Sequence, residues 1–185
     1  MNRLPSRMRH RPHSFQAPRR RAAVLIWSTA VPVVAAALVG CAGTPMRAPP
    51  ELPPAAAAEL VLVAMTYIDT PYRRGGNAAE TGFDCSGFTR HVYERSLGLV
   101  LPRTAWEQAR HPALREVPTA ALRAGDLVFF NTLQRPFSHV GIYIGEGRFV
   151  HAPRPGLTVR SEPMTSAYWS ARFEGARRAL NAAPG

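Results

Sequence analysis

Lysine is absent from the 185-residue sequence, and all 23 of its basic residues are arginine. Acidic residues are absent from the first 41 positions, and residues 1–21 alone hold seven arginines. The formal net charge of +11 is therefore concentrated near the N-terminal end. The other 16 arginines face 12 acids, which leaves a net charge of +4. That balance is ordinary for a soluble domain and gives no electrostatic footprint for a nucleic-acid partner.

Cysteine is almost as scarce, because the chain has only Cys41 and Cys85. Closely spaced ligand pairs such as CxxC, which structural zinc sites usually show, do not occur. The two cysteines could form one disulfide at most, but each has a better separate interpretation. Internal repeats are also lacking, so one domain with a leader fits the length.

The N-terminal region has the parts of a secretory signal. Basic residues 1–21 precede residues 22–39, which are almost entirely apolar. The apolar run ends in Leu38-Val39-Gly40-Cys41, which looks like a bacterial lipobox. We therefore predict a signal peptide over 1–40 that is removed before a lipidated Cys41. An uncleaved transmembrane anchor and plain secretion are the alternatives, since this stretch of 18 residues is near the lower limit for a span.

Residues 41–54 read as a lipidated cysteine followed by a linker. Five prolines in this stretch oppose helix formation and favour an extended tether. Two or more acyl chains on Cys41 would anchor the protein stably. Ala42, in place of aspartate, resembles the sorting class of Gram-negative outer-membrane lipoproteins. We expect an outer-membrane lipoprotein that faces the periplasm.

A single domain is expected over 55–181, with a short tail at 182–185. Apolar residues at helical spacing predict helices, and short apolar or alternating runs predict strands. The predicted helices cover 55–68, the residues that follow Cys85, and 105–110, where Thr104 and Glu107 have the spacing of a capping box. The predicted strands cover 127–130, 138–144, 148–152, 158–160 and 173–180.

The stretch Phe83-Asp84-Cys85-Ser86-Gly87-Phe88-Thr89 places a cysteine among an acid, a hydroxyl and a glycine. Phe88, Val92 and Leu97 continue it at helical spacing, so Cys85 falls near the first turn of a helix with Asp84 as N-cap. The positive end of the helix dipole favours the thiolate, which is the nucleophilic form. A buried, inert cysteine is the alternative.

Two histidines lie on neighbouring predicted strands. If Gly145-Glu146-Gly147 is the loop, paired residue numbers sum to 292, so Gly141 faces His151. His139 then lies diagonal to His151 on the same face, opposite the core, roughly 7–8 Å away. Convergence of the two imidazoles predicts a site, whereas two unrelated surface histidines are the alternative.

Together, these residues fit nucleophilic catalysis. A cysteine would attack, one histidine would take its proton, and another polar group would orient that histidine. Zinc bound by Cys85, His139 and His151, with Asp84 as a further ligand, is the rival use of the same side chains.

Six stretches resemble, in order and spacing, the NlpC-type cell-wall cysteine peptidases, a papain-like group of bacterial enzymes. They are Thr70-Pro71-Tyr72-Arg73-Arg74-Gly75-Gly76, Phe83-Asp84-Cys85-Ser86-Gly87-Phe88, Leu101-Pro102-Arg103-Thr104, Ala124-Gly125-Asp126-Leu127-Val128-Phe129-Phe130, Ser138-His139-Val140-Gly141-Ile142-Tyr143-Ile144-Gly145 and Phe149-Val150-His151-Ala152. A lipobox followed by one such domain is most similar to the Spr-type outer-membrane lipoproteins.

The resemblance implies an α+β fold of the papain-like NlpC type. N-terminal helices carrying the cysteine would pack on a central antiparallel sheet carrying the histidines. The implied reaction is hydrolysis of the γ-D-glutamyl–meso-diaminopimelate amide in peptidoglycan stem peptides, with no metal or organic cofactor. The implied partners are those peptides and a membrane, reached through the lipid on Cys41.

The resemblance also implies a role for individual residues. Cys85 would be the nucleophile, His139 the general base and His151 the residue that orients it. The remaining implied site residues are Tyr72 near the oxyanion and, along the substrate cleft, Asp84 and Ser86. Two alternatives remain at this point: an amidase or acyltransferase that uses the same triad, and a catalytically silent lipoprotein that binds murein.

Overall fold

The computed structural model of the chain describes residues 51–180. The predicted signal peptide, Cys41 and the tail at 182–185 lie outside the described residues. The helices are α1 (Pro54–Thr66), α2 (Cys85–Leu97), α3 (Ala105–Gln108), the 3₁₀ helix η1 (Thr119–Ala121) and α4 (Ala167–Ser170). The strands are β1 (Asn77–Ala78), β2 (Gly82–Phe83), β3 (Leu114–Val117), β4 (Leu127–Phe130), β5 (His139–Gly145), β6 (Arg148–His151), β7 (Arg160–Pro163) and β8 (Phe173–Ala179). None of the helices between residues 51 and 180 combines the length and hydropathy that crossing a bilayer requires.

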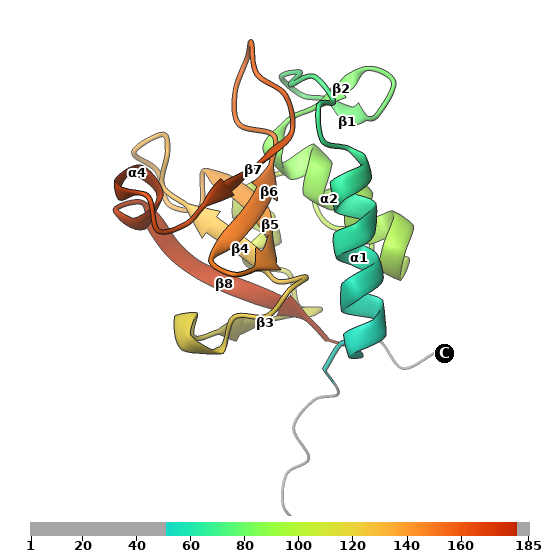
Figure 1. Cartoon of the computed structure of the whole chain (residues 1–185), viewed down its shortest axis with the longest axis vertical. Helices are drawn as coiled ribbons and strands as arrows, with labels where there is room; N and C mark the ends of the chain where they lie inside the picture. Colours follow the sequence, from blue (N-terminus) through green and yellow to red (C-terminus); the bar gives the residue numbers. More distant parts are fainter. Residues whose placement is uncertain (1–50, 181–185) are drawn as a thin grey trace, which may run out of the picture. The chain divides into compact units, whose positions relative to one another are not determined.

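Six strands form one antiparallel sheet in the order β3-β8-β4-β5-β6-β7, and β1 and β2 form a separate two-stranded ribbon. Helices α1 and α2 pack against each other and against β5 (Figure 1). The cysteine helix therefore covers one face of the sheet at the strand that begins with His139. The predicted α+β fold, with helices on a central antiparallel sheet, is confirmed.

Both faces of the sheet are buried. The larger core fills the space between the helices and the sheet, where Phe88 of α2 and Ile142 of β5 are fully buried. A second cluster covers the opposite face and includes Phe130 and Trp169. The prediction that the histidines lie on a non-core face is wrong, because the Trp169 indole of α4 packs on both of their rings.

The β5–β6 hairpin keeps the predicted register, since Ile142 pairs with Val150. Gly145 belongs to β5 and sits at a register shift, so the connecting turn is shorter than predicted and consists of residues 146–147. Gly141 is enclosed: a Cβ there would stand 2.8 Å from the Val150 carbonyl oxygen. The close approach of the two strands that carry the histidines therefore depends on glycine at this position.

One strand lies later in the chain than predicted. The expected strand at 158–160 is replaced by β7, which starts at the last of those residues. The preceding residues bond to the loop after α1 instead: the Val159 N–H donates to the Thr70 carbonyl, and the Tyr72 N–H donates to the Leu157 carbonyl. This segment therefore braces the loop that carries Tyr72.

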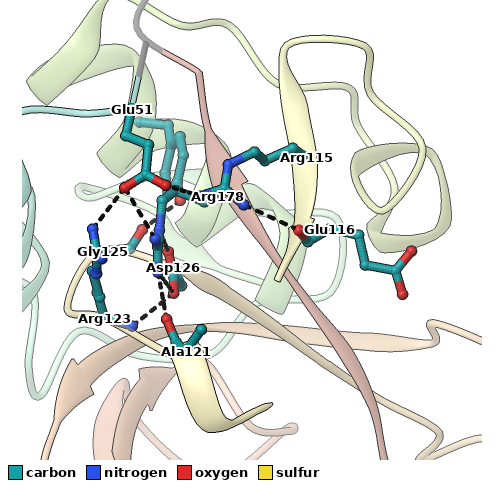
Figure 2. Close-up of polar contacts among 9 residues, drawn as sticks. Glu51, Arg115, Glu116, Ala121, Arg123, Gly125, Asp126 and Arg178 are labelled. Carbon is teal, nitrogen blue, oxygen red and sulfur yellow. Dashed lines mark hydrogen bonds and ion pairs between the residues drawn. The ribbon is translucent and has the colours of Figure 1, made fainter. Parts of the chain in front are cut away.

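Glu51, which the sequence analysis assigns to the linker, packs with the folded domain. Its backbone pairs with that of Leu180, and its carboxylate forms ion pairs with Arg115, Arg123 and Arg178 (Figure 2). The packed part of the domain thus begins a few residues before the predicted boundary.

A buried ion pair lies under this cluster. Arg178 donates through Nε to Asp126 Oδ1 at 2.7 Å and through Nη2 to Oδ2 at 2.8 Å. The two side chains are only 6% and 1% exposed. The Tyr93 hydroxyl donates to the neighbouring Gly125 carbonyl at 2.6 Å. These bonds connect β8, the turn before β4 and helix α2, so the second half of the cysteine helix is also fixed to the sheet.

Candidate active site

Asp84 fixes the first turn of α2, as the sequence predicts. Its Oδ1 accepts a hydrogen bond from the Gly87 N–H at 2.7 Å, and its Oδ2 accepts one from the Gly75 N–H at 3.0 Å. Gly87 leaves no room for a side chain, because a Cβ there would stand 2.0 Å from the Gly76 carbonyl oxygen. The loop therefore enters α2 in one way and places Cys85 at its first residue.

Arg103 binds the same carboxylate from the other side. Its Nη1 donates to Asp84 Oδ1 at 3.0 Å and to Ser86 Oγ at 2.9 Å, and its Nη2 reaches the second Asp84 oxygen. Such two-point, charge-assisted contacts are strong and directional. Arg103 is a site residue that was not predicted from the sequence, although its place in Leu101-Pro102-Arg103-Thr104 was the available signal.

Buried Gln108 of α3 locks this arrangement. Its Nε2 donates to the Ser86 carbonyl at 2.9 Å and to the Pro102 carbonyl at 3.0 Å. Its Oε1 accepts from the Thr89 hydroxyl at 2.8 Å. The predicted capping box of Thr104 and Glu107 is present and starts the short helix that carries this glutamine.

Cys85 is a free, half-buried cysteine beside β5. The backbone groups of Ser86 and of Val140, the residue that follows His139, are near enough to the thiol to lower its pKa. The hairpin thus brings the end of β5 that carries His139 against the start of α2.

The environment of the thiol disfavours its ionisation. Burial, followed by the charge of Asp84, raises the pKa of Cys85 to about 11, although those backbone groups and Arg103 act in the opposite direction. This direction is opposite to the one expected from the helix terminus, because desolvation and a neighbouring carboxylate both disfavour the charged thiolate.

His139 and His151 converge as predicted. The Nε2 atom of His139 lies 2.7 Å from Nδ1 of His151, and the two residues are 4% and 0% exposed. The rings meet edge to face, with centroids 5.0 Å apart. Trp169 stacks on His139 at 5.4 Å with an interplanar angle of 26° and meets His151 edge to face at 4.9 Å. The indole therefore holds both imidazoles in place.

Both histidines favour the neutral form. Burial lowers the pKa of His139 well below its ordinary value, and the neighbouring His151 lowers it further, while Glu162 raises it. Burial also lowers the pKa of His151, against the raising effect of Glu162. Near neutral pH, these directions favour a neutral Cys85 thiol and two neutral imidazoles.

Glu162 of β7 is a further group at this site that the sequence analysis missed. Its Oε1 lies 3.6 Å from Nε2 of His151. Arg160 and the Trp169 indole donate to its two oxygens. These contacts, with His151 as the largest cause, lower the pKa of Glu162 to about 2.

Two cavities border the thiol and the histidines. One of about 770 Å³ is lined by Asp84, Cys85, Ser86, Arg103, Thr104, Ala105, Trp106, Arg135, Pro136, Phe137 and Ser138. The other, of about 400 Å³, is lined by Thr132, Leu133, His139, Pro153, Arg154, Leu157, Arg160, Glu162, Ser166, Tyr168 and Trp169. The larger cleft is the one that Cys85 lines, and the smaller one is lined by His139.

Tyr72 lies close enough to the thiol for the two groups to interact electrostatically. Burial first, then the charges of Cys85 and Asp84, raise the pKa of the Tyr72 phenol. The hydroxyl consequently stays protonated and can donate a hydrogen bond.

Among residues 51–180, no three His, Cys, Asp or Glu side chains are grouped as metal ligands.

Comparison with known proteins gives a consistent result. Residues 69–178 match the NlpC/P60 family. Murein DD-endopeptidase MepH of Escherichia coli is 38% identical over 117 residues, which are 63% of this chain and 43% of that protein. Murein DD-endopeptidase MepS/Murein LD-carboxypeptidase of Escherichia coli is 41% identical over 110 residues, 60% of this chain and 56% of that protein. The Gamma-DL-glutamyl hydrolase of Bacillus subtilis is 38% identical over 127 residues, 68% of this chain and 30% of that protein.

Each of these relatives is longer than the part that this chain matches. Among solved structures, an NLP/P60-family protein similar to a lipoprotein from Staphylococcus aureus has a TM-score of 0.64 and 33% identity, covering 74% of this chain and 45% of that one. The matched segment includes the cysteine helix, the histidine hairpin and the loop of Tyr72. The chain therefore belongs to the NlpC/P60 family.

Proposed function

We propose that the protein is a cysteine peptidase that hydrolyses an amide bond of peptidoglycan stem peptides through a thioester acyl-enzyme. The observation that carries this proposal is a free cysteine at a helix start that lines a cleft of about 770 Å³ and has as a neighbour Val140, the residue that follows the first member of a hydrogen-bonded histidine pair. The names of MepH, MepS and the Gamma-DL-glutamyl hydrolase support the substrate class.

In the proposed acylation step, Cys85 is the nucleophile and His139 is the general base. Because His151 occupies Nε2 of His139, Nδ1 is the ring nitrogen that remains to take the thiol proton. The sulfur attacks the carbonyl carbon as that proton moves, which suits a thiol with a pKa of about 11. Protonated His139 then gives the proton to the leaving amine as the C–N bond breaks.

In the proposed deacylation step, His139 takes a proton from water, and the resulting hydroxide attacks the thioester. The sulfur leaves as a thiolate and recovers its proton from His139. The backbone N–H of Cys85 and the protonated Tyr72 hydroxyl are the proposed donors to the oxyanion in both steps. His151 orients the ring of His139 throughout.

For the scissile bond, we propose the γ-D-glutamyl–meso-diaminopimelate amide. The similarity to a Gamma-DL-glutamyl hydrolase supports this choice. A DD bond at a cross-link is the second candidate, because MepH and MepS are named DD-endopeptidases. The polar wall of Asp84, Ser86 and Arg103 along the cleft is the proposed surface for the charged part of the stem peptide.

The test is mass spectrometry of purified muropeptides incubated with residues 42–185. Cleavage at γ-D-glutamyl bonds shortens monomeric stems, whereas DD cleavage converts cross-linked dimers into intact monomers. Cys85→Ala and alkylation of Cys85 are each expected to abolish turnover, with the circular-dichroism spectrum unchanged. Continued cleavage by Cys85→Ala would disprove the proposal that Cys85 is the nucleophile.

The product masses, sedimentation with murein and the effect of EDTA distinguish the alternative functions. An amidase or acyltransferase would release different masses, or transfer the acyl group to an added amine. A silent binding protein would sediment with murein without cutting it. Activity that is lost with EDTA and restored by zinc would favour the metal site.

We further propose that the mature protein is an outer-membrane lipoprotein anchored through Cys41, where the chain has a lipobox-like sequence. Cys41→Ala is expected to block processing and membrane association without changing the activity of residues 42–185. Wild-type protein cut at another position, with an unmodified Cys41, would refute this proposal.

A further inference from the structure

We propose that Glu162 is a positioning residue whose carboxylate selects the tautomer of His151 and, through it, the tautomer of His139. The catalytic consequence of this inference rests on the proposed peptidase function, whereas the tautomers themselves can be observed without substrate.

The first observation is an unpartnered nitrogen. Nε2 of His151 is buried and has no hydrogen-bond partner within residues 51–180. It faces Glu162 Oε1 at 3.6 Å, just beyond hydrogen-bond length but within the range of an ion pair. The other ring nitrogen, Nδ1, is already bonded to His139. The neighbours that determine which ring nitrogen of His151 carries the proton are therefore the His139 imidazole at Nδ1 and the Glu162 carboxylate at Nε2.

The second observation is that Glu162 is held in place as an acceptor. In the β6–β7 ladder Glu162 pairs with Phe149, which puts its side chain on the face of His151, two residues along β6. The Trp169 indole donates to Oε2, and Arg160 donates to Oε1. An ionised carboxylate can only accept hydrogen bonds, and both of its neighbours here are obligate donors.

The tautomers follow from this arrangement. A carboxylate opposite Nε2 of His151 favours the proton on that nitrogen, which leaves Nδ1 of His151 as an acceptor. Nε2 of His139 must then carry a proton and donate across the 2.7 Å contact. Nδ1 of His139 is consequently left unprotonated, the state that a base facing the Cys85 thiol requires.

The charge of Glu162 also acts on the protonated state. When His139 accepts a proton, the positive charge lies at one end of a row that leads through His151 to the carboxylate. The charged groups that face this row are Glu162, which raises the pKa of both imidazoles, and Arg160, which lowers that of His151. The aromatic neighbours of the two rings, Trp169, Phe130 and Phe149, are neutral.

Glu162→Gln keeps the size and removes the charge, so it tests the effect of the charge. Its amide oxygen can still accept from Arg160 and from His151 Nε2, so this variant can keep the wild-type tautomers. Glu162→Leu removes the acceptor as well and leaves Nδ1 as the one ring nitrogen of His151 with a partner, so it tests the tautomers. Glu162→Asp keeps the charge and serves as the rescue variant. Glu146→Gln makes the same chemical change at an exposed turn position and serves as the control.

The first measurement is nitrogen-15 NMR of the histidine side chains in the full-length protein without substrate. In the wild type, Nε2–H is expected for both His139 and His151. Glu162→Leu is expected to populate the Nδ1–H forms, while Glu162→Asp and Glu146→Gln keep the wild-type pattern. Unchanged tautomers in folded Glu162→Leu would overturn the proposal, whatever the substrate of the enzyme proves to be.

The second measurement is the pH profile of kcat/KM on one muropeptide. Glu162→Gln is expected to lower kcat about 10- to 100-fold with little change in KM, less than the ~10⁴-fold loss when a carboxylate touching the catalytic histidine is replaced. Because Glu162 raises the pKa of His139, its removal is expected to shift the acidic limb to lower pH. A loss of stability with unchanged pH profile would show a structural role only and would overturn the proposal. A wild type inactive on murein would refute the proposed function and leave the tautomer result standing.

Discussion

The charge of Asp84 should slow the chemical modification of Cys85, although it caps the helix that presents the thiol. After burial, Asp84 is the largest cause that raises the pKa of Cys85 from 9.0 to about 11. Asp84→Asn removes the negative charge but keeps a good N-cap, because asparagine and aspartate cap helices about equally. It also leaves the Arg103 guanidinium without its counter-ion, and that positive charge lowers the thiol pKa further. Both effects therefore lower the pKa of Cys85.

The size of the effect can be bounded. Each unit by which the pKa falls raises the thiolate fraction about tenfold, but the less basic thiolate loses about threefold in nucleophilicity, so the net gain is about threefold per unit. The pKa of Cys85 rises from 9.0 to about 11, which is two units. The part of this rise that burial causes remains in Asp84→Asn. Alkylation at pH 8 should therefore be faster in Asp84→Asn, by no more than about tenfold.

The assay is the second-order rate of iodoacetamide labelling of Cys85, followed by intact mass between pH 6 and pH 11. Ser86→Ala is the matched control, because it removes one contact of Arg103 without changing any charge. Labelling isolates the electrostatic effect, whereas murein turnover would also respond to changes in the cleft wall. A rate in folded Asp84→Asn equal to or below that of the wild type would refute the reasoning.

Two further predictions concern the histidine pair and the buried ion pair. His139→Gln should lower kcat/KM by orders of magnitude, because His139 must transfer a proton. His151→Gln should retain measurably more activity, because an amide can still form a hydrogen bond to His139. Equal losses of kcat/KM on one muropeptide would contradict this division of roles. Arg178→Met should lower the unfolding free energy, measured by urea titration, by about 3–5 kcal/mol, because it leaves the buried Asp126 carboxylate without its ion-pair partner. Arg123→Gln, at an arginine that is 68% exposed, should lower it by about 0–1 kcal/mol. Similar losses in both variants would show that burial of the pair does not decide its contribution.

Local signals predicted the parts of the site that depend on neighbours in sequence. The N-cap at Asp84 follows from an acid placed before apolar residues at helical spacing, and the capping box follows from Thr104 and Glu107, three positions apart. The register that brings His139 and His151 together follows from a short glycine-containing turn. In each case the information lies within about a dozen residues, where helix and hairpin geometry leave few alternatives.

The features that the sequence analysis missed depend on contacts between segments or on burial. Arg103 reaches Asp84 across 19 positions, and nothing in the local pattern connects them. Glu162 lies in Arg160-Ser161-Glu162-Pro163, which lacks the apolar alternation of a half-buried strand. The raised pKa of Cys85 could not be foreseen either, because desolvation is a property of the packed domain rather than of the helix terminus.

The pairing of Glu51 with Leu180 has a consequence for protein engineering. The two ends of the packed domain meet at one corner, so a short peptide could join residue 180 to residue 51 without crossing the sheet. Domains whose ends lie this close commonly tolerate circular permutation. New ends could then be opened at an exposed loop, which would let the domain be attached to a surface from a different side while the cysteine helix and the histidine hairpin keep their connections.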